Sequence, residues 1–182
     1  MKKSHTHLIA FMAIAIAINY VGANIALFLR LPLYLDTIGT LLVAVVFGPW
    51  LGAATAIISA LLSWMTTDIF SLYFSPVAIL VAVIAGFLVK KNSKATSLIW
   101  KSLLVSLPGT IVSSAITVIL FHGITSSGSS LLAQFLHSMG VGMTTSLVLV
   151  QASTDYIDRL LSLIIVIAVV KSLKKYTPSL LD

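Results

Sequence analysis

Long apolar runs separated by short polar segments dominate the chain. They predict helices near residues 8–29, 37–47, 50–67, 73–89, 99–121 and 155–170. A bilayer core about 30 Å thick needs about 20 apolar residues per helix, so a chain of 182 residues has room for about six or seven crossings. We therefore predict an all-α integral membrane protein, a single membrane domain built as a bundle of six transmembrane helices.

The segment 122–154 is the least regular part of the pattern. Residues 131–150 are apolar enough for a seventh span, but polar residues and glycines interrupt them at Gln134, His137, Gly140 and Gly142. A seventh span would also place the two chain ends on opposite sides of the membrane. We expect this segment to be an outer loop that contains an amphipathic or re-entrant stretch.

Composition supports lipid as the main solvent of this protein. Apolar residues make up 59% of the chain and charged residues only 9%, whereas soluble domains carry about 25% charged residues. The sequence contains no cysteine, which excludes disulfides and thiol chemistry.

The basic residues give the orientation. Nine of the eleven fall between the predicted spans on one side or at the chain ends, namely Lys2, Lys3, Lys90, Lys91, Lys94, Lys101, Lys171, Lys174 and Lys175. Lysine and arginine accumulate on the cytoplasmic side of membrane proteins, so both termini are expected in the cytoplasm. The net charge of +6 is then explained by the lysines on the cytoplasmic side, so no nucleic-acid partner is expected.

The acidic residues, apart from Asp182, lie at the opposite, outer ends of the predicted helices. Ionisable groups at membrane depth mark functional sites by default, and rings and amides accompany these acids. The candidate substrate-binding residues are Asn19, Asn24, Arg30, Tyr34, Asp36, Trp64, Asp68, Tyr73 and Asp155. Each could instead serve a local role: an acid as a first-turn charge, Asp155 as the i,i+4 partner of Arg159, or a ring as part of the interfacial aromatic belt.

Two predicted helices carry small residues at four-residue spacing, which allows close backbone approach in lipid. The first has Ala13 and Ala17, and the third has Gly52, Ala56 and Ala60. We expect the third helix to use this face for packing inside the bundle. For the first helix, packing in the bundle and docking to another membrane protein remain open.

Several of these segments, in order along the chain, resemble those of one family. They are Leu31 to Thr40, Phe47 to Gly52 with its Phe-Gly-Pro turn, the Ala13/Ala17 pair, Phe74-Ser75-Pro76 and Ser153 to Arg159. In these segments the chain resembles the S components of energy-coupling factor (ECF) vitamin transporters of the bacterial cytoplasmic membrane. The resemblance covers essentially the whole chain.

The resemblance implies a six-helix bundle with a vitamin pocket in its outer half, closed by the loops after the first and third helices. It implies that Ala13 and Ala17 face a membrane coupling (T) subunit that works with two ATPase subunits. This chain is then expected to bind no cofactor, and the partner subunits use ATP. Metal-specific members of the family have histidine after the initiator methionine, and Lys2 occupies that position here, so no metal site is expected.

The kinds of side chain at the outer face indicate the chemistry of the substrate. Rings and acceptors outnumber free cations at the outer face, which favours a neutral or cationic ring compound such as hydroxymethylpyrimidine, with the anion pantothenate as the alternative. The sequence contains no glycine-rich phosphate loop and no Gly-x-Ser-x-Gly motif. We therefore expect a transport subunit and no enzyme, the remaining alternative being a small membrane channel or sensor.

Overall fold

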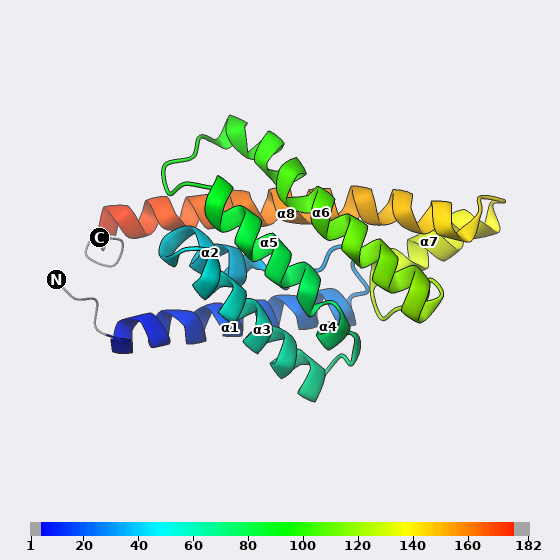
Figure 1. Cartoon of the computed structure of the whole chain (residues 1–182), viewed down its shortest axis with the longest axis horizontal. Helices are drawn as coiled ribbons and strands as arrows, with labels where there is room; N and C mark the ends of the chain where they lie inside the picture. The colour runs from blue at the N-terminus through cyan, green and yellow to red at the C-terminus, as the bar shows by residue number, and fades with distance from the viewer. Residues whose placement is uncertain (1–4, 177–182) are drawn as a thin grey trace.

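The computed structural model describes residues 5–176, which form eight helices and no strand (Figure 1). They are α1 (His5–Phe28), α2 (Ile38–Phe47), α3 (Pro49–Thr66), α4 (Phe70–Tyr73), α5 (Ser75–Leu88), α6 (Ala95–Phe121), α7 (Gly128–Ser138) and α8 (Met143–Tyr176). The helices α1, α2, α3, α5, α6 and α8 run back and forth along one bundle, and α4 and α7 lie away from the end where α1 begins and α8 ends (Figure 1).

Five of the expected helices correspond to α1, α2, α3, α5 and α6 within a few residues. The sixth differs, because α8 begins at Met143 and not near residue 155. Residues 143–154, expected as part of an outer loop, instead belong to this helix, and Ser146, Gln151 and Thr154 are buried in the bundle, where tertiary packing overrides their low apolar character. The remainder of 122–154 contains α7 and two short connections.

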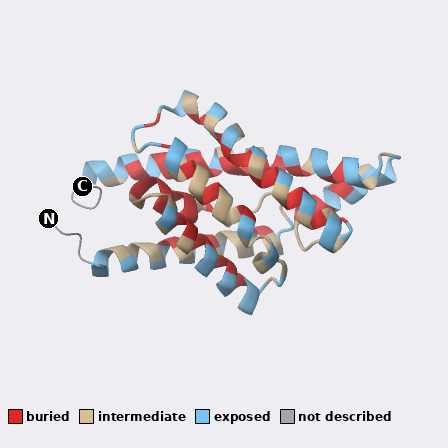
Figure 2. Ribbon diagram, in the orientation of Figure 1, coloured by how far each residue is buried: buried red, intermediate tan, exposed pale blue. Residues whose placement is uncertain are grey.

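Three helices, α1, α3 and α6, are long and apolar enough to cross a membrane, and α2 and α5 are shorter apolar helices. Large apolar side chains are exposed along the whole bundle, among them Ile14, Trp50, Met65, Trp100 and Ile111. Figure 2 shows exposed positions repeated along the outer faces of α1, α3 and α6. Such a surface is stable in lipid and would aggregate in water.

The buried faces of α6 and α8 change character halfway along the bundle. Toward the start of α6 and the end of α8 they contribute Leu98, Val105, Leu163 and Val166 to an apolar core shared with α2 and α5. Beyond that point the buried residues of α6 and α8 are mostly polar or charged. One half of the bundle is therefore filled by hydrocarbon and the other by hydrogen-bonding groups.

Small residues bring α1, α2 and α3 close together. A Cβ atom on Gly39 would lie 2.0 Å from the backbone oxygen of Ala15, so only glycine fits this crossing. Gly52, Ala56 and Ala60 of α3 are all buried, which confirms the expected packing face. Ala13 and Ala17 are exposed on α1, which packs mainly against α2 and α3.

The lysines of the described chain cluster at the end where α1 begins and α8 ends. Lys90, Lys91 and Lys94 surround the α5–α6 connection, and Lys171, Lys174 and Lys175 belong to the last turns of α8. Lys2 and Lys3 lie outside the described residues. The polar half of the bundle is at the opposite end, so the two ends differ in chemistry.

Candidate functional site

A main cavity of about 90 Å³ lies in the polar half of the bundle. It is bounded by α4, α5, α6, α8 and the loops after α1 and α6. Its lining residues are Tyr34, Asp68, Phe70, Ser71, Phe74, Val77, Ala78, Ser113, Thr125, Ser126, Ser127, Gln151, Asp155 and Arg159. Apolar and aromatic walls with a few convergent polar groups are typical of small-molecule sites.

One face of α8 supplies the charged wall. Gln151, Asp155, Asp158 and Arg159 recur at three- and four-residue spacing, which places them on one side of a helix, and all four are buried. Their spacing along α8 explains why one helix can carry most of the site's chemistry.

Hydroxyl groups on the part of α6 that follows Pro108 contact this face of α8. Pro108 has no backbone N–H and so interrupts the hydrogen bonding of the helix. Thr110 Oγ1 donates to Asp155 Oδ2 at 2.7 Å, and Ser113 Oγ lies 3.4 Å from the same oxygen. One turn further, Ser114 Oγ donates to Gln151 Oε1 at 2.6 Å. These hydrogen bonds orient the α8 side chains toward the cavity.

Arg159 forms its ion pair with Asp158, at 2.7 Å between Nη1 and Oδ2. It also donates to Thr37, and Asp36 Oδ1 is 4.0 Å away. The suggested i,i+4 pair with Asp155 is absent from the ion pairs of residues 5–176. The guanidinium instead reaches toward the loop after α1, where the Thr37 hydroxyl accepts from it and the Asp36 carboxylate lies nearby.

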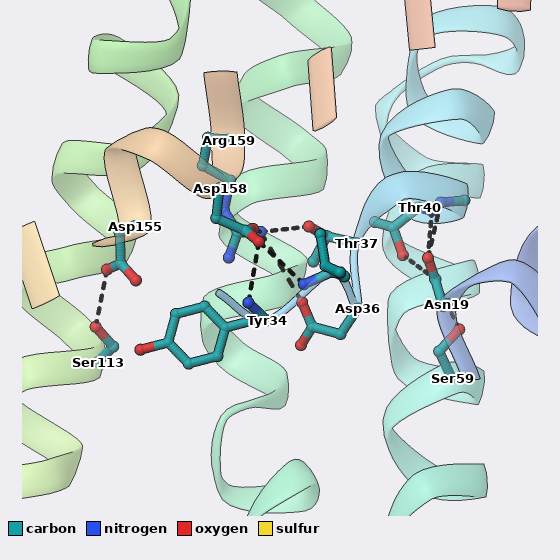
Figure 3. A network of polar contacts seen from close by, with 12 residues as sticks. Asn19, Tyr34, Asp36, Thr37, Thr40, Ser59, Ser113, Asp155, Asp158 and Arg159 are labelled. Carbon is teal, nitrogen blue, oxygen red and sulfur yellow. Dashed lines mark hydrogen bonds and ion pairs between the residues drawn. The ribbon is translucent and has the colours of Figure 1, made fainter. Parts of the chain in front are cut away.

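Asp158 also anchors that loop, residues 29–37. Its Oδ1 accepts from the backbone N–H groups of Tyr34 and Leu35, at 3.0 and 2.9 Å (Figure 3). Leu35 has φ 55°, a left-handed conformation that is uncommon for a bulky residue. The paired hydrogen bonds hold this turn and direct the Tyr34 ring into the cavity, where its hydroxyl meets Ser129 Oγ at 2.9 Å.

Asp36, in the same loop, has one buried oxygen although its side chain is partly exposed. Its side chain is 45% exposed, yet Oδ1 is buried without a hydrogen-bond partner. Burial raises the pKa of Asp36 to about 6, and the positive charge of Arg159 opposes part of this rise. Burial and the nearby Asp155 also raise the pKa of Tyr34, so this ring acts as a neutral phenol.

A small cavity of about 30 Å³ adjoins the main one, and both share Ser71 and Ala78 as wall residues. Asn19 and Asp36 line it. Asn19 Oδ1 accepts from the backbone N–H groups of Gly39 and Thr40 at 2.7 and 3.3 Å, and Nδ2 donates to two hydroxyls. Asn19 thus has all its hydrogen-bonding groups occupied and connects α1 to α2 and α3.

At the mouth of the main cavity, Asp68 joins two loops. Its Oδ1 accepts from Ser126 Oγ at 3.0 Å, across from the loop after α3 to the loop after α6. Oδ2 accepts from Ser71 Oγ at 3.3 Å. This contact closes the side of the cavity between α4 and α7.

The structure distributes the nine predicted site residues over three places. Tyr34, Asp68 and Asp155 line the main cavity, and Asn19 and Asp36 line the small one. The other four line neither of these cavities: Asn24 donates to the Tyr20 backbone oxygen, Arg30 is exposed at the end of α1, Trp64 is 41% exposed on α3, and Tyr73 packs edge-on against Phe121.

Several lining residues were not in the predicted set, chiefly Phe70, Phe74, Ser113, Gln151 and the loop 125–127. For α6 and α8 a signal existed, since hydroxyl and amide side chains recur there at helical spacing in otherwise apolar helices. Nothing comparable in the sequence distinguishes Phe70 and Phe74, which are partly buried like other phenylalanines of the bundle.

Among residues 5–176 no group of three or more histidine or acidic side chains has the arrangement needed for a metal ion. In a comparison with known families, the model of the ECF transporter substrate-specific component matches residues 7–170. No curated protein and no solved structure matches the chain. Because the family match spans most of the sequence, the chain belongs to the substrate-specific components of ECF transporters, which are membrane transport subunits.

Proposed function

We propose that this protein captures a small vitamin or vitamin precursor at the outer face of the bacterial cytoplasmic membrane and delivers it with an ATP-driven ECF module. The observation that carries the proposal is the polar cavity in the half of the bundle opposite the lysines. The positive-inside rule assigns the lysine end to the cytoplasm, so the cavity faces outward.

In this arrangement α1, α2, α3, α5, α6 and α8 cross the membrane, and both chain ends are cytoplasmic. Helices α4 and α7 lie at the outer surface. The buried face of α7 carries Ser129 and Ser130, whereas Leu131, Leu132 and Phe135 are exposed. An amphipathic helix of this kind suits a position against lipid at the membrane boundary.

The apolar half of the bundle argues against a channel. Leu41, Val81, Val105 and Leu163 are completely buried there, and a conducting pore needs polar groups or water along its length. A site that opens on one side only fits a binding subunit, which needs partners to complete transport.

For the substrate we favour a small ring compound such as hydroxymethylpyrimidine. Phe70, Phe74 and Tyr34 offer aromatic surface, and carboxylate and amide oxygens can accept hydrogen bonds from a ring amine. The alternative, pantothenate, needs a free cation for its carboxylate, but Arg159 is already paired with Asp158. A volume of about 90 Å³ also favours a small ligand.

Docking to the coupling subunit is assigned to α1. This helix packs mainly on α2 and α3, and Ala13 and Ala17 are exposed on its remaining surface. Small residues there permit another helix to approach closely. The coupling subunit and two ATPase subunits then supply the energy, and this chain itself binds no cofactor.

Binding and docking can be tested separately. Protein purified in mild detergent should carry a small molecule identifiable by mass spectrometry, and should bind hydroxymethylpyrimidine without ATP. Ala13→Trp and Ala17→Trp should abolish uptake by cells that contain the ECF module and leave binding intact. Ala168→Trp, on an exposed position of α8, is the matched control. Uptake that survives in both α1 variants would refute the docking assignment, and absence of any bound small molecule would refute the capture role.

A further inference from the structure

Acidic side chains outnumber basic ones around the main cavity. Asp36, Asp68, Asp155 and Asp158 lie on or beside its wall, whereas Arg159 is the one guanidinium among the described residues that line it. Arg30, at the same end of the bundle, is exposed and lines neither cavity. Since Asp158 already pairs with Arg159 at 2.7 Å, the other carboxylates leave an excess of negative charge.

Of the three remaining acids, Asp155 is the most buried, with 4% of its surface exposed. Its Oδ2 accepts from Thr110 and Ser113, but Oδ1 has no hydrogen bond to any residue of the described chain. Figure 3 shows one oxygen of Asp155 on Ser113 and the other turned away from it. A buried carboxylate that makes no close ion pair is costly, so the unused oxygen of Asp155 is a strong acceptor.

The other acids are already engaged. Both Asp68 oxygens accept from serine hydroxyls at the cavity mouth. Asp158 accepts from two backbone N–H groups and from Arg159. Asp36 lies on the small cavity, with its side chain 45% exposed. Asp155 is therefore the acid with a free oxygen on the main cavity.

We infer that Asp155 Oδ1 is the counter-charge for the substrate and that the cavity selects a small organic cation, a ring that carries an ammonium group or a protonated ring nitrogen. This inference rests on the proposed function, which places the substrate in this cavity. Phe70, Phe74 and Tyr34 in the lining of the same cavity favour an organic cation over a hydrated metal ion, because aromatic faces attract cations and bury apolar rings. An anion would meet the unpaired carboxylates and no free cation.

Three monosubstituted benzenes of similar size and different charge test the inference: benzylammonium, benzyl alcohol and benzoate. Each is titrated into the purified protein, freed of bound ligand, and binding is followed by calorimetry and by the shift in unfolding temperature. We expect benzylammonium to bind about tenfold or more tightly than benzyl alcohol, since charge-assisted hydrogen bonds are the stronger ones, and benzoate to bind weakest.

Asp155→Asn removes the charge and keeps a carbonyl oxygen that can still accept from Thr110 and Ser113. It should abolish the preference for benzylammonium over benzyl alcohol and leave benzyl alcohol binding within about twofold. Asp155→Glu, which keeps the charge, should retain the preference even if overall affinity falls. Ser153→Ala, at an exposed position of α8 that does not line the cavity, is the control and should also retain it.

Equal binding of the three probes, tighter binding of benzoate, or a preference that survives Asp155→Asn would overturn the inference and leave the proposed function standing. Failure of the wild-type protein to bind any of the three would contradict both. Because the preference is a ratio measured within one protein, a moderate loss of stability in a variant does not imitate it.

Discussion

Replacing Asp158 by asparagine should release the loop between α1 and α2 from α8. The carboxylate is completely buried and accepts from the Tyr34 and Leu35 backbone and from Arg159, at 3.0, 2.9 and 2.7 Å. Asparagine has one acceptor oxygen in place of two, and its amide group would point N–H donors at the guanidinium or at the loop. The substitution therefore leaves Arg159 buried without its main partner.

The magnitude follows from that loss. Removing one member of a buried ion pair costs about 3–5 kcal/mol, and Arg159 is 5% exposed, so we expect Asp158→Asn to fall in this range. Asp36→Asn is the control, because its carboxylate is 4.0 Å from the same guanidinium and 45% exposed. Such an exposed pair contributes about 1 kcal/mol or less.

Two assays separate global from local effects. Denaturant unfolding in detergent gives the change in free energy, and limited trypsin digestion, read by mass spectrometry, reports cleavage after Arg30 in the loop. Asp158→Asn should accelerate that cleavage and weaken ligand binding, because Tyr34 is no longer held in the cavity. The reasoning is refuted if Asp158→Asn destabilises no more than Asp36→Asn and leaves cleavage after Arg30 unchanged.

Three further predictions follow from local geometry. Burial raises the pKa of Asp36 from its ordinary value of 3.8 to about 6, so its stabilising contribution is complete below about pH 4 and is lost as pH rises through 6; the melting temperature of wild type relative to Asp36→Asn should fall over this window, and a constant difference would contradict it. Gly39→Ala places a Cβ atom 2.0 Å from an α1 backbone oxygen and should destabilise by about 1–3 kcal/mol, whereas Gly142→Ala, whose nearest neighbour is 3.9 Å away, should change stability little in the same unfolding assay. Ser126→Ala removes the 3.0 Å hydrogen bond to Asp68 across the cavity mouth and should speed ligand dissociation severalfold in stopped-flow measurements; an unchanged rate would show that this contact does not restrain the ligand.

The division of α6 and α8 into an apolar and a polar half is central to how this bundle works. Apolar residues such as Leu98 and Val166 seal the lysine end, and buried hydroxyls and acids line the other end. Polar groups are expensive inside a membrane protein unless they are satisfied. Here most are paired with each other, and the oxygen of Asp155 that is not paired faces the cavity.

Much of the architecture could be predicted from local sequence. The length of the apolar runs indicated an all-α membrane protein, and the Gly48-Pro49 turn correctly separated α2 from α3. The lysine distribution predicted a bundle with two different ends. The start of α8 was missed by twelve residues, because Gln151 looks like a loop residue until α6 provides its partners, Ser114 and Thr117.

The sequence by itself determined the solvent, the helices and the end of the bundle where polar chemistry collects, because these depend on composition and spacing along the chain. Only the tertiary structure decided that Arg159 pairs with Asp158, that Asp155 keeps a free oxygen and that Trp64 and Arg30 line neither cavity. Those outcomes depend on which helices face each other and on how the loop after α1 folds back onto α8. Contacts between residues more than a hundred positions apart, such as Tyr34 with Asp158, are set by packing and not by local pattern.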